Sequence, residues 1–283
     1  MALTVNTNTT SLGVQKNLNR ASDALSTSMT RLSSGLKINS AKDDAAGLQI
    51  ATRMTSQIRG QTMAIKNAND GISIAQTAEG AMQEQTNILQ RMRELAVQSR
   101  NDSNSTEDRK ALNKEFAQMS DELSRIAKST QLNGKNLLDG TAGKLTFQVG
   151  SNSGADNQIS ISLDSGFDAA SLSVDSATIA ITGSTSDEAE ASMNAALDAI
   201  DLALQTINTT RADLGASQNR LTSTVNNLQN INENAEAARG RVQDTDFAAE
   251  TAQLTKQQTL QQASTSVLAQ ANQLPSAVLK LLQ

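Results

Sequence analysis

The sequence contains no histidine and no cysteine, and its only aromatic residues are four phenylalanines among 283 residues. The absence of His and Cys excludes Ser-His-Asp and Cys-His catalytic sites, His-based zinc sites and thiol redox chemistry. Acid–base catalysis would be left to carboxylates and lysines alone. Because aromatic residues are so scarce, any core must be thin and built from small aliphatic side chains.

The chain also has a single proline and a net charge of −5. Almost nothing interrupts helices, so the composition is typical of a helical rod. A negative chain argues against a nucleic-acid partner, because the phosphate backbone needs a concentrated basic surface. No apolar run reaches the roughly 18 residues of a transmembrane helix, so we expect no membrane partner. The N-terminal segment "MALTVNTNTTSLGVQKNLNR" lacks the basic start and apolar core of a cleavable signal peptide, and any export would use another route.

The N-terminal segment has the period of a helix, with apolar residues three and four positions apart. These residues are Val14, Leu18, Ala21, Leu25, Met29, Leu32 and Leu36. A loop is predicted around Gly35 to Ser40. We interpret Ser40 as an N-cap and Asp43 as a first-turn acid, and Asp43 and Asp44 both suit the positive end of the following helix.

A very long helix is predicted from about Ala45 to Arg100. Two apolar columns with seven-residue spacing run along it: Ile58, Ile65 and Ile72 in one, and Ala68, Ala75, Met82, Leu89 and Ala96 in the other. Four glycines lie inside this helix, namely Gly47, Gly60, Gly71 and Gly80. They indicate either close approach of another backbone or tolerated weak spots, since each costs about 1 kcal/mol relative to Ala. After a turn, a shorter helix presents Leu112, Phe116, Met119, Leu123 and Ile126.

The period changes to that of strands after this helix. Alternating apolar residues predict strands at 145–149 and 159–163, with weaker candidates at "SLSV" (171–174) and "TIAITG" (178–183). Gly, Ser, Asn and Asp between them are turn formers. Because this insert has little apolar bulk, we expect it to be exposed.

The strongest periodicity follows the insert. An unbroken apolar heptad column contains Met193, Ile200, Ile207, Leu214, Leu221, Leu228 and Ala235. Its neighbour contains Leu197, Leu204, Arg211, Gln218, Val225 and Asn232. Because all the polar residues fall in the second column, we predict the first as a buried rod seam, carried by Ile200, Ile207, Leu214, Leu221 and Leu228.

These segments predict a mainly α fold: a long antiparallel helical hairpin rod with terminal coiled-coil helices and a small β insert at the tip. The expected domains are an N-terminal inner helix (1–40), N-terminal rod helices (41–140), the β insert (141–187), a C-terminal rod helix (188–240) and a C-terminal inner helix (241–283). The terminal helices bury too little to offset their ordering entropy, so we expect them to fold against other copies. The predicted self-assembly residues are Leu18, Leu25, Leu32, Leu260, Val267, Leu274 and Leu281.

Several segments resemble bacterial flagellin. They are "RLSSGLKINSAKDDAAGLQIA" (31–51), "MALTVNTNTTSL" at the start, "QRMRELAVQS" (90–99), "LNGKNLLDG" (132–140), "RADLGASQNRL" (211–221) and "TSVLAQANQLPSAVLKLL" (265–282). The resemblance covers most of both ends of the chain, and only the insert lacks a family motif. It implies a structural subunit of the flagellar filament, which serves swimming motility.

The same resemblance implies how the subunit is exported, where it assembles and which partners it has. A flagellin is exported unfolded through the type III channel of the flagellum, assembles under a cap, and is extracellular without a cleaved signal peptide. The implied partners are further copies of the chain, the flagellar cap and junction proteins, an export chaperone at the C-terminal helix, and host innate immune flagellin receptors. The segment at 90–99 is similar to the one read by the flagellin-sensing Toll-like receptor, which implies receptor binding by Gln90, Arg91, Leu95 and Glu115.

Each of these hypotheses has a plainer alternative. Arg91, a half-exposed Leu95 and Glu115 could serve helix packing only. Asp43 and Asp44 could be a catalytic pair, but helix capping is the favoured interpretation. The acidic cluster Asp244, Asp246 and Glu250 lacks the spacing of a calcium loop, so a charged surface patch is favoured over a cation site.

Two other functions share some of these sequence features with a filament subunit. A hook–filament junction protein would have similar termini but fewer of these motifs. A helical signalling hairpin of the chemoreceptor type would end in a tight helical turn, which the strand pattern at 145–163 contradicts. No residue set supports an enzyme, and no metal or cofactor is expected.

Overall fold

The computed structural model describes residues 7–280, and it describes their side chains as far as Gln273. The helices are α1 (Thr9–Ser34), α2 (Ala45–Ser99), α3 (Thr106–Ser129), α4 (Ser186–Gln243) and α5 (Phe247–Lys280), with a short 3₁₀ turn at Ala155–Asn157. The strands are β1 (Gln131–Leu132), β2 (Lys135–Asn136), β3 (Gly143–Gln148) and β4 (Gln158–Leu163). The described residues form two compact units: a terminal unit, 7–58 with 233–280, and a central unit, 59–232. The mainly helical fold predicted from the sequence is confirmed.

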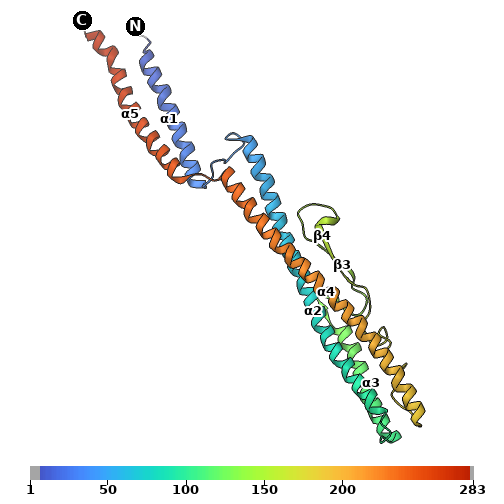
Figure 1. The fold of residues 1–283 in the computed structure, drawn as a ribbon. Helices are drawn as coiled ribbons and strands as arrows, with labels where there is room; N and C mark the ends of the chain where they lie inside the picture. Colours follow the sequence, from blue (N-terminus) through green and yellow to red (C-terminus); the bar gives the residue numbers. More distant parts are fainter. Residues whose placement is uncertain (1–6, 281–283) are drawn as a thin grey trace. The chain divides into compact units, whose positions relative to one another are not determined.

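In the terminal unit, α1 and α5 lie side by side in antiparallel directions (Figure 1). At one end, Asn8 Nδ2 donates to Ala271 O at 2.7 Å, and at the other Arg31 Nη1 lies 3.6 Å from Glu250 Oε2. Helix α1 then ends at Gly35, whose φ of 73° suits glycine and whose N–H donates to Arg31 O. Because Asn8 bonds to Ala271, the first described turns of α1 lie beside the last turns of α5.

The seam between α1 and α5 is narrow. Its buried residues are small or polar: Ala21, Ser28, Gln257 and Ala271. The predicted leucines of α1 (Leu18, Leu25 and Leu32) are only half-buried. Because small side chains remove little apolar surface from water, this pair gains much less from burial than a leucine seam would.

The seam of the central unit is continuous by comparison. The five predicted seam residues of α4 are all buried, namely Ile200, Ile207, Leu214, Leu221 and Leu228, whereas Met193 and Ala235 at the ends of the predicted column are half-buried. The predicted α2 column is buried as well, and each of its residues is without exposed surface: Ala68, Ala75, Met82, Leu89 and Ala96. The second α4 column is half-buried at every position, including Arg211 and Gln218. Gln218 Nε2 there donates to Glu79 Oε2 at 2.9 Å, which is the arrangement of a polar residue at the edge of a seam.

Helix α3 packs on the same core (Figure 1). It begins with a capping box, in which Ser105 and Asp108 each accept a hydrogen bond from the other's backbone N–H. Phe116 and Leu123 are fully buried, as the predicted stripe requires, but Ser120 and Ala127 are buried as well and Ile126 is only half-buried. The inner face of α3 is thus rotated slightly from the predicted one.

The β insert contains one hairpin of two longer strands. β3 pairs antiparallel with β4, and Leu145 lies opposite Ile161. The weaker strand candidates at 171–174 and 178–183 were wrong, since those residues form turns and irregular backbone. The expected exposure was also wrong: Leu145, Ile161 and Leu163 are buried in the same core as α2, α3 and α4. Its apolar residues are few, but nearly all of them point to one side and are covered by the helices.

The glycines of α2 serve two different purposes. A Cβ at Gly71 would lie 3.1 Å from Leu221 Cδ1 and 3.2 Å from Phe147, and one at Gly60 would lie 2.9 Å from Ser151 Cβ. At Gly80, nothing lies within 4 Å of that position. Close approach therefore explains Gly60 and Gly71, whereas Gly80 is a tolerated weak spot.

We predict that Gly80→Ala raises the free energy of unfolding of the central unit by about 1 kcal/mol, because Ala restricts the unfolded chain and is accommodated without a contact. Gly71→Ala gains the same helix propensity but must displace Leu221 and Phe147, so it should be neutral or destabilising. Urea unfolding followed by circular dichroism measures both variants. Equal stabilisation by the two substitutions would contradict this account of the packing.

Candidate interaction surfaces

The flagellin-like stretch at 31–51 forms a tied connection between α1 and α2. Lys37 N donates to Gln243 O at 2.7 Å and Thr245 N donates to Gly35 O at 3.0 Å, so this connection pairs with the one between α4 and α5. Ile38 is buried, and a Cβ at Gly47 would lie 2.6 Å from its Cδ1. Glycine at position 47 therefore lets the loop fold closely over the first turn of α2.

The two aspartates of this connection have separate structural roles. Asp44 is the N-cap of α2, since its Oδ1 accepts from Gly47 N at 2.9 Å. The expected cap at Ser40 was wrong, because the helix begins at Ala45. Asp43 instead closes a turn by accepting from Ser40 N and Asn39 N, and these backbone bonds lower the pKa of its carboxyl group. Capping of α2 therefore accounts for Asp44, and closure of the preceding turn accounts for Asp43.

The acidic cluster at 244–250 is also used structurally. Asp246 Oδ1 accepts from Ala248 N at 2.9 Å and so caps α5, and Glu250 pairs with Arg31. Asp244 N continues the last turn of α4 by donating to Gly240 O. Within the described residues, no three His, Cys, Asp or Glu side chains are grouped as a metal site would require.

The α1–α5 pair carries large apolar side chains that the pair itself does not cover. Leu12 and Met29 on α1 and Leu260 and Val267 on α5 are between 45% and 57% exposed. We call these four residues the terminal apolar surface. Among the other predicted self-assembly residues, Leu274 lies within α5 but its side chain is beyond the described ones, and Leu281 lies outside the described residues.

A second surface lies where α2 and α3 meet. The Arg91 side chain is 48% exposed, and its Nε and Nη2 donate to Glu115 Oε1 at 3.1 and 2.9 Å. Its Nη1 donates to Glu94 Oε2 at 2.9 Å, and neighbouring Gln90 is exposed. These bonds with Glu94 and Glu115 raise the pKa of Arg91. The structure thus brings three of the four predicted receptor residues together, with Glu94 as an addition.

Leu95, the fourth, does not belong to this surface. It is 1% exposed and part of the central core, so the expectation of a half-exposed side chain was wrong. The physical reason is its position: Leu95 follows Met92 by three residues and precedes Ser99 by four, and because both of these are buried it lies on the inner face of α2. Arg91, four residues earlier, lies just beyond the rim of that face.

Two buried polar residues were missed by the sequence analysis. Arg109 is buried, and its guanidinium donates to Ser99 O at 3.0 Å and Gly183 O at 3.3 Å. It satisfies a free carbonyl at the end of α2 and joins it to the segment before α4. Gln85 is fully buried and donates to Phe167 O at 2.8 Å. Both interrupt apolar patterns, and that interruption was their only signal.

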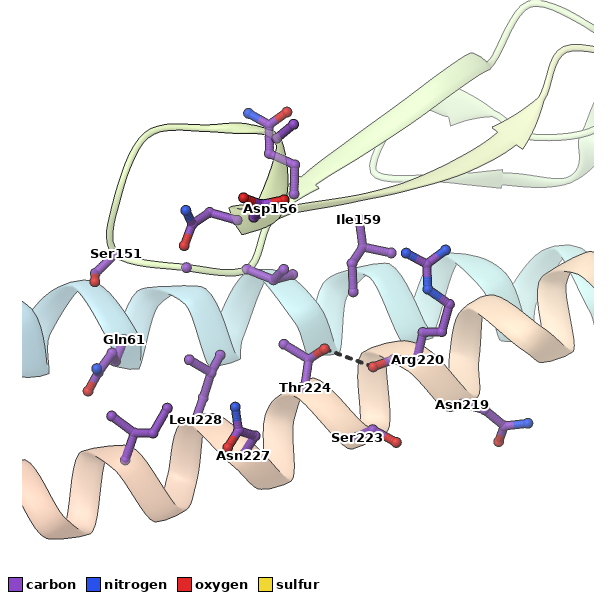
Figure 2. A pocket seen from close by; sticks show the side chains of 16 residues that line it. Gln61, Ser151, Asp156, Ile159, Asn219, Arg220, Ser223, Thr224, Asn227 and Leu228 are labelled. Carbon is purple, nitrogen blue, oxygen red and sulfur yellow. Dashed lines mark hydrogen bonds between the residues drawn. The ribbon is translucent and has the colours of Figure 1, made fainter.

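A groove of about 850 Å³ lies between the β3–β4 loop and α4 (Figure 2). Gln61 of α2, Asp156 of the loop and Arg220 of α4 line it, together with amides, hydroxyls and a few aliphatic side chains. Thr224 Oγ1 is occupied by a bond to Arg220 O within α4. The lining of this groove offers hydrogen-bond donors and acceptors beside aliphatic side chains.

No helix in the described part of the chain is both long enough and apolar enough to span a bilayer. The family model of the bacterial flagellin N-terminal helical region matches residues 5–143, and that of the C-terminal helical region matches 197–282. The residues between the two matches include β4 and the segment that leads to α4.

Similar proteins cover the whole chain. Polar flagellin C of Vibrio parahaemolyticus is 40% identical over 385 residues, and flagellin B of Vibrio cholerae is 40% identical over 375, each spanning all of both chains. Among solved structures, Bacillus cereus flagellin is 32% identical, with a TM-score of 0.47, over 58% of this chain and 88% of that one. The two family matches and the full-length identities show that this chain belongs to the bacterial flagellin family.

Proposed function

We propose that this flagellin is the repeating subunit of the flagellar filament and that it polymerises through α1 and α5. The observation that carries the proposal is the terminal apolar surface. Leu260 and Val267 are seven residues apart, so they lie on one stripe of α5, and both are nearly half exposed. Surface of this kind is stabilised by removal from water, at about 25 cal/mol per Å² of apolar area.

A second copy of the chain is the occupant that best fits this surface. Small and polar residues fill the seam between α1 and α5. If the larger apolar side chains faced this seam instead, the contacts that now hold the two helices together would be lost. Other copies present the same stripe repeatedly, as a helical polymer requires. We assign residues 1–40 and 241–283 to an inner helical layer, 41–140 and 188–240 to the rod, and 141–187 to the insert.

The proposal includes the route to the filament. The subunit is exported without a cleaved signal peptide, assembles outside the cell under a cap, and joins the hook through junction proteins. The exposed stripe of Leu260 and Val267 supports an export chaperone on α5, because an apolar stripe needs cover until other subunits bury it. In the filament the protein has a structural role and performs no catalysis.

The surface of Gln90, Arg91, Glu94 and Glu115 supports a second proposal, binding of the monomer to host innate immune flagellin receptors. Arg91 is held in one orientation by two carboxylates while half of its side chain stays accessible. A guanidinium that is already ordered loses less entropy on binding and is a frequent interface anchor. Leu95 contributes by holding α2 in place from the core, not by contact.

Polymerisation is tested by Leu260→Asp combined with Val267→Asp. We predict that this variant no longer forms filaments when seeded, because two carboxylates would have to be buried between subunits. Its central unit should keep its thermal unfolding midpoint, since neither residue belongs to the core. Gln258→Asp, at an exposed polar position on the same helix, is the control and should polymerise. Normal filaments from the double variant in electron microscopy would refute the proposed surface.

Receptor binding is tested by Arg91→Ala and Glu115→Ala in monomeric protein. Each should weaken signalling by a large factor, in line with truncations of interface anchors that cost about 2 kcal/mol or more. Arg93→Ala is the matched control, because Arg93 pairs with Asp201 on α4 instead, and it should signal normally. Leu95→Ala should lower stability by about 2–5 kcal/mol and weaken signalling only as far as it unfolds the protein. Equal signalling by the Arg91 and Arg93 variants would remove this surface from the account.

A further inference from the structure

The turn between β1 and β2 exposes an asparagine–glycine pair to solvent. It consists of Asn133 and Gly134, with φ values of 52° and 74°. Asn133–Gly134 is the sequence's single Asn-Gly pair. Both residues are exposed, and nothing lies within 4 Å of the position a Cβ on Gly134 would take.

The reactive groups of this pair are not tied by hydrogen bonds. Gly134 lies outside the register of β1 and β2, and within the described residues its N–H has no acceptor and the Asn133 amide has no partner. At two other sites Asn precedes Ser, the exposed Asn39 and the half-buried Asn104, and both are tied by hydrogen bonds. Asn39 Nδ2 donates to Leu36 O while Ser40 N donates to Asp43, and Asn104 Nδ2 donates to Gln98 O while Ser105 N donates to Asp108.

We propose that Asn133 is a site of spontaneous modification, at which its amide is converted to a carboxylate in the folded protein. The deprotonated backbone nitrogen of Gly134 attacks Asn133 Cγ, and a five-membered imide forms as the Cγ–Nδ2 bond breaks. Ammonia leaves with a proton taken from water. A second water then opens the imide at either carbonyl, giving aspartate or isoaspartate. The reactants are the chain and water, and no oxidant or enzyme is needed.

The short β1–β2 hairpin can open far enough for Gly134 N to approach Asn133 Cγ. The left-handed turn must open before the nitrogen can reach Cγ, and only two residue pairs hold it: Gln131 with Asn136 and Leu132 with Lys135. An isolated pair of two-residue strands is of marginal stability, so local opening costs little. Gly134 adds no side chain that would shield its nitrogen.

The modification would change a defined part of the surface. Asn133 lines a second groove, of about 730 Å³, between α2 and β3, in which Asp70 is the one acidic residue. An aspartate at 133 places a second negative charge in that groove. An isoaspartate also adds a methylene to the backbone, and a two-residue turn cannot absorb it without loss of the β1–β2 pairing.

The test uses the native full-length protein, as monomer, aged in mildly alkaline buffer. Peptide mapping by mass spectrometry, with enzymatic labelling of isoaspartate, gives the rate at each asparagine. We expect Asn133 to react several-fold faster than Asn152, which is exposed but followed by Ser153, and Asn39 and Asn104 to react slowest. Asn133→Asp is the control for the charge and should retain the hairpin, because Asp also adopts the left-handed conformation.

The same measurement on protein unfolded in urea separates the structural claim from the sequence. If Asn133 reacts in urea but not in the native protein, the turn protects it and the proposal is wrong. Equal native rates at Asn133, Asn39 and Asn104 would also overturn it, because the hydrogen bonds at the latter two would then have no effect. Isoaspartate at 133 with faster hydrogen exchange at Leu132 and Lys135 supports both the site and its consequence.

Discussion

Burial of the apolar column of α4 against α2 is the interaction on which the central unit depends. Five branched aliphatic residues, Ile200 to Leu228 at seven-residue intervals, each contribute about 1.5–3 kcal/mol by complete burial. The same core contains Ala68 and Ala75 of α2, and small side chains of this kind let packed helices approach closely. Gly71 extends this to the β insert, since Leu221 and Phe147 both pack against the position that a Cβ on residue 71 would take. Helix α3 and the insert then cover what remains of the same core.

The terminal unit is built in the opposite way. Its seam uses Ala21, Ser28, Gln257 and Ala271, and its larger apolar side chains face outward. In a single chain these larger apolar side chains therefore stay in contact with water. The free energy of burying them is gained only when another copy covers them. That arrangement suits a subunit that must be stable at its centre before assembly and must gain stability at its ends during assembly. The same surface cannot be both buried in the monomer and available to another copy.

The sequence predicted most of the helical frame because heptad spacing directly reports burial. The five seam residues of α4 and the α2 column from Ala68 to Ala96 are all buried, and the second α4 column is half-buried throughout. The misses have local causes. Leu95 was assigned to the receptor surface by resemblance, whereas its three-residue spacing from the buried Met92 puts it on the inner face of α2. Asp44 rather than Ser40 caps α2, because Asp43 closes a turn with Asn39 and Ser40 before the helix begins. Apolar periodicity carries no information about such a turn.

The insert was harder to predict because burial there depends on tertiary contacts. Leu145, Ile161 and Phe167 are too few to suggest a core by composition, yet the helices cover all three. Buried polar residues such as Arg109 and Gln85 find backbone carbonyls far away in sequence, so no local pattern could indicate their partners. The receptor residues came from resemblance, and the structure decides only which of them are accessible.

The central claim is that the terminal helices complete their core only against other copies. Hydrogen exchange of dilute monomer and of assembled filament, resolved by residue, tests this claim most directly. The account predicts slow exchange along 200–228 in both states, and exchange along 9–34 and 247–273 that is fast in the monomer and slow in the filament. Equally slow exchange of the terminal helices in the monomer would contradict it, because α1 and α5 would then be stable as a pair alone.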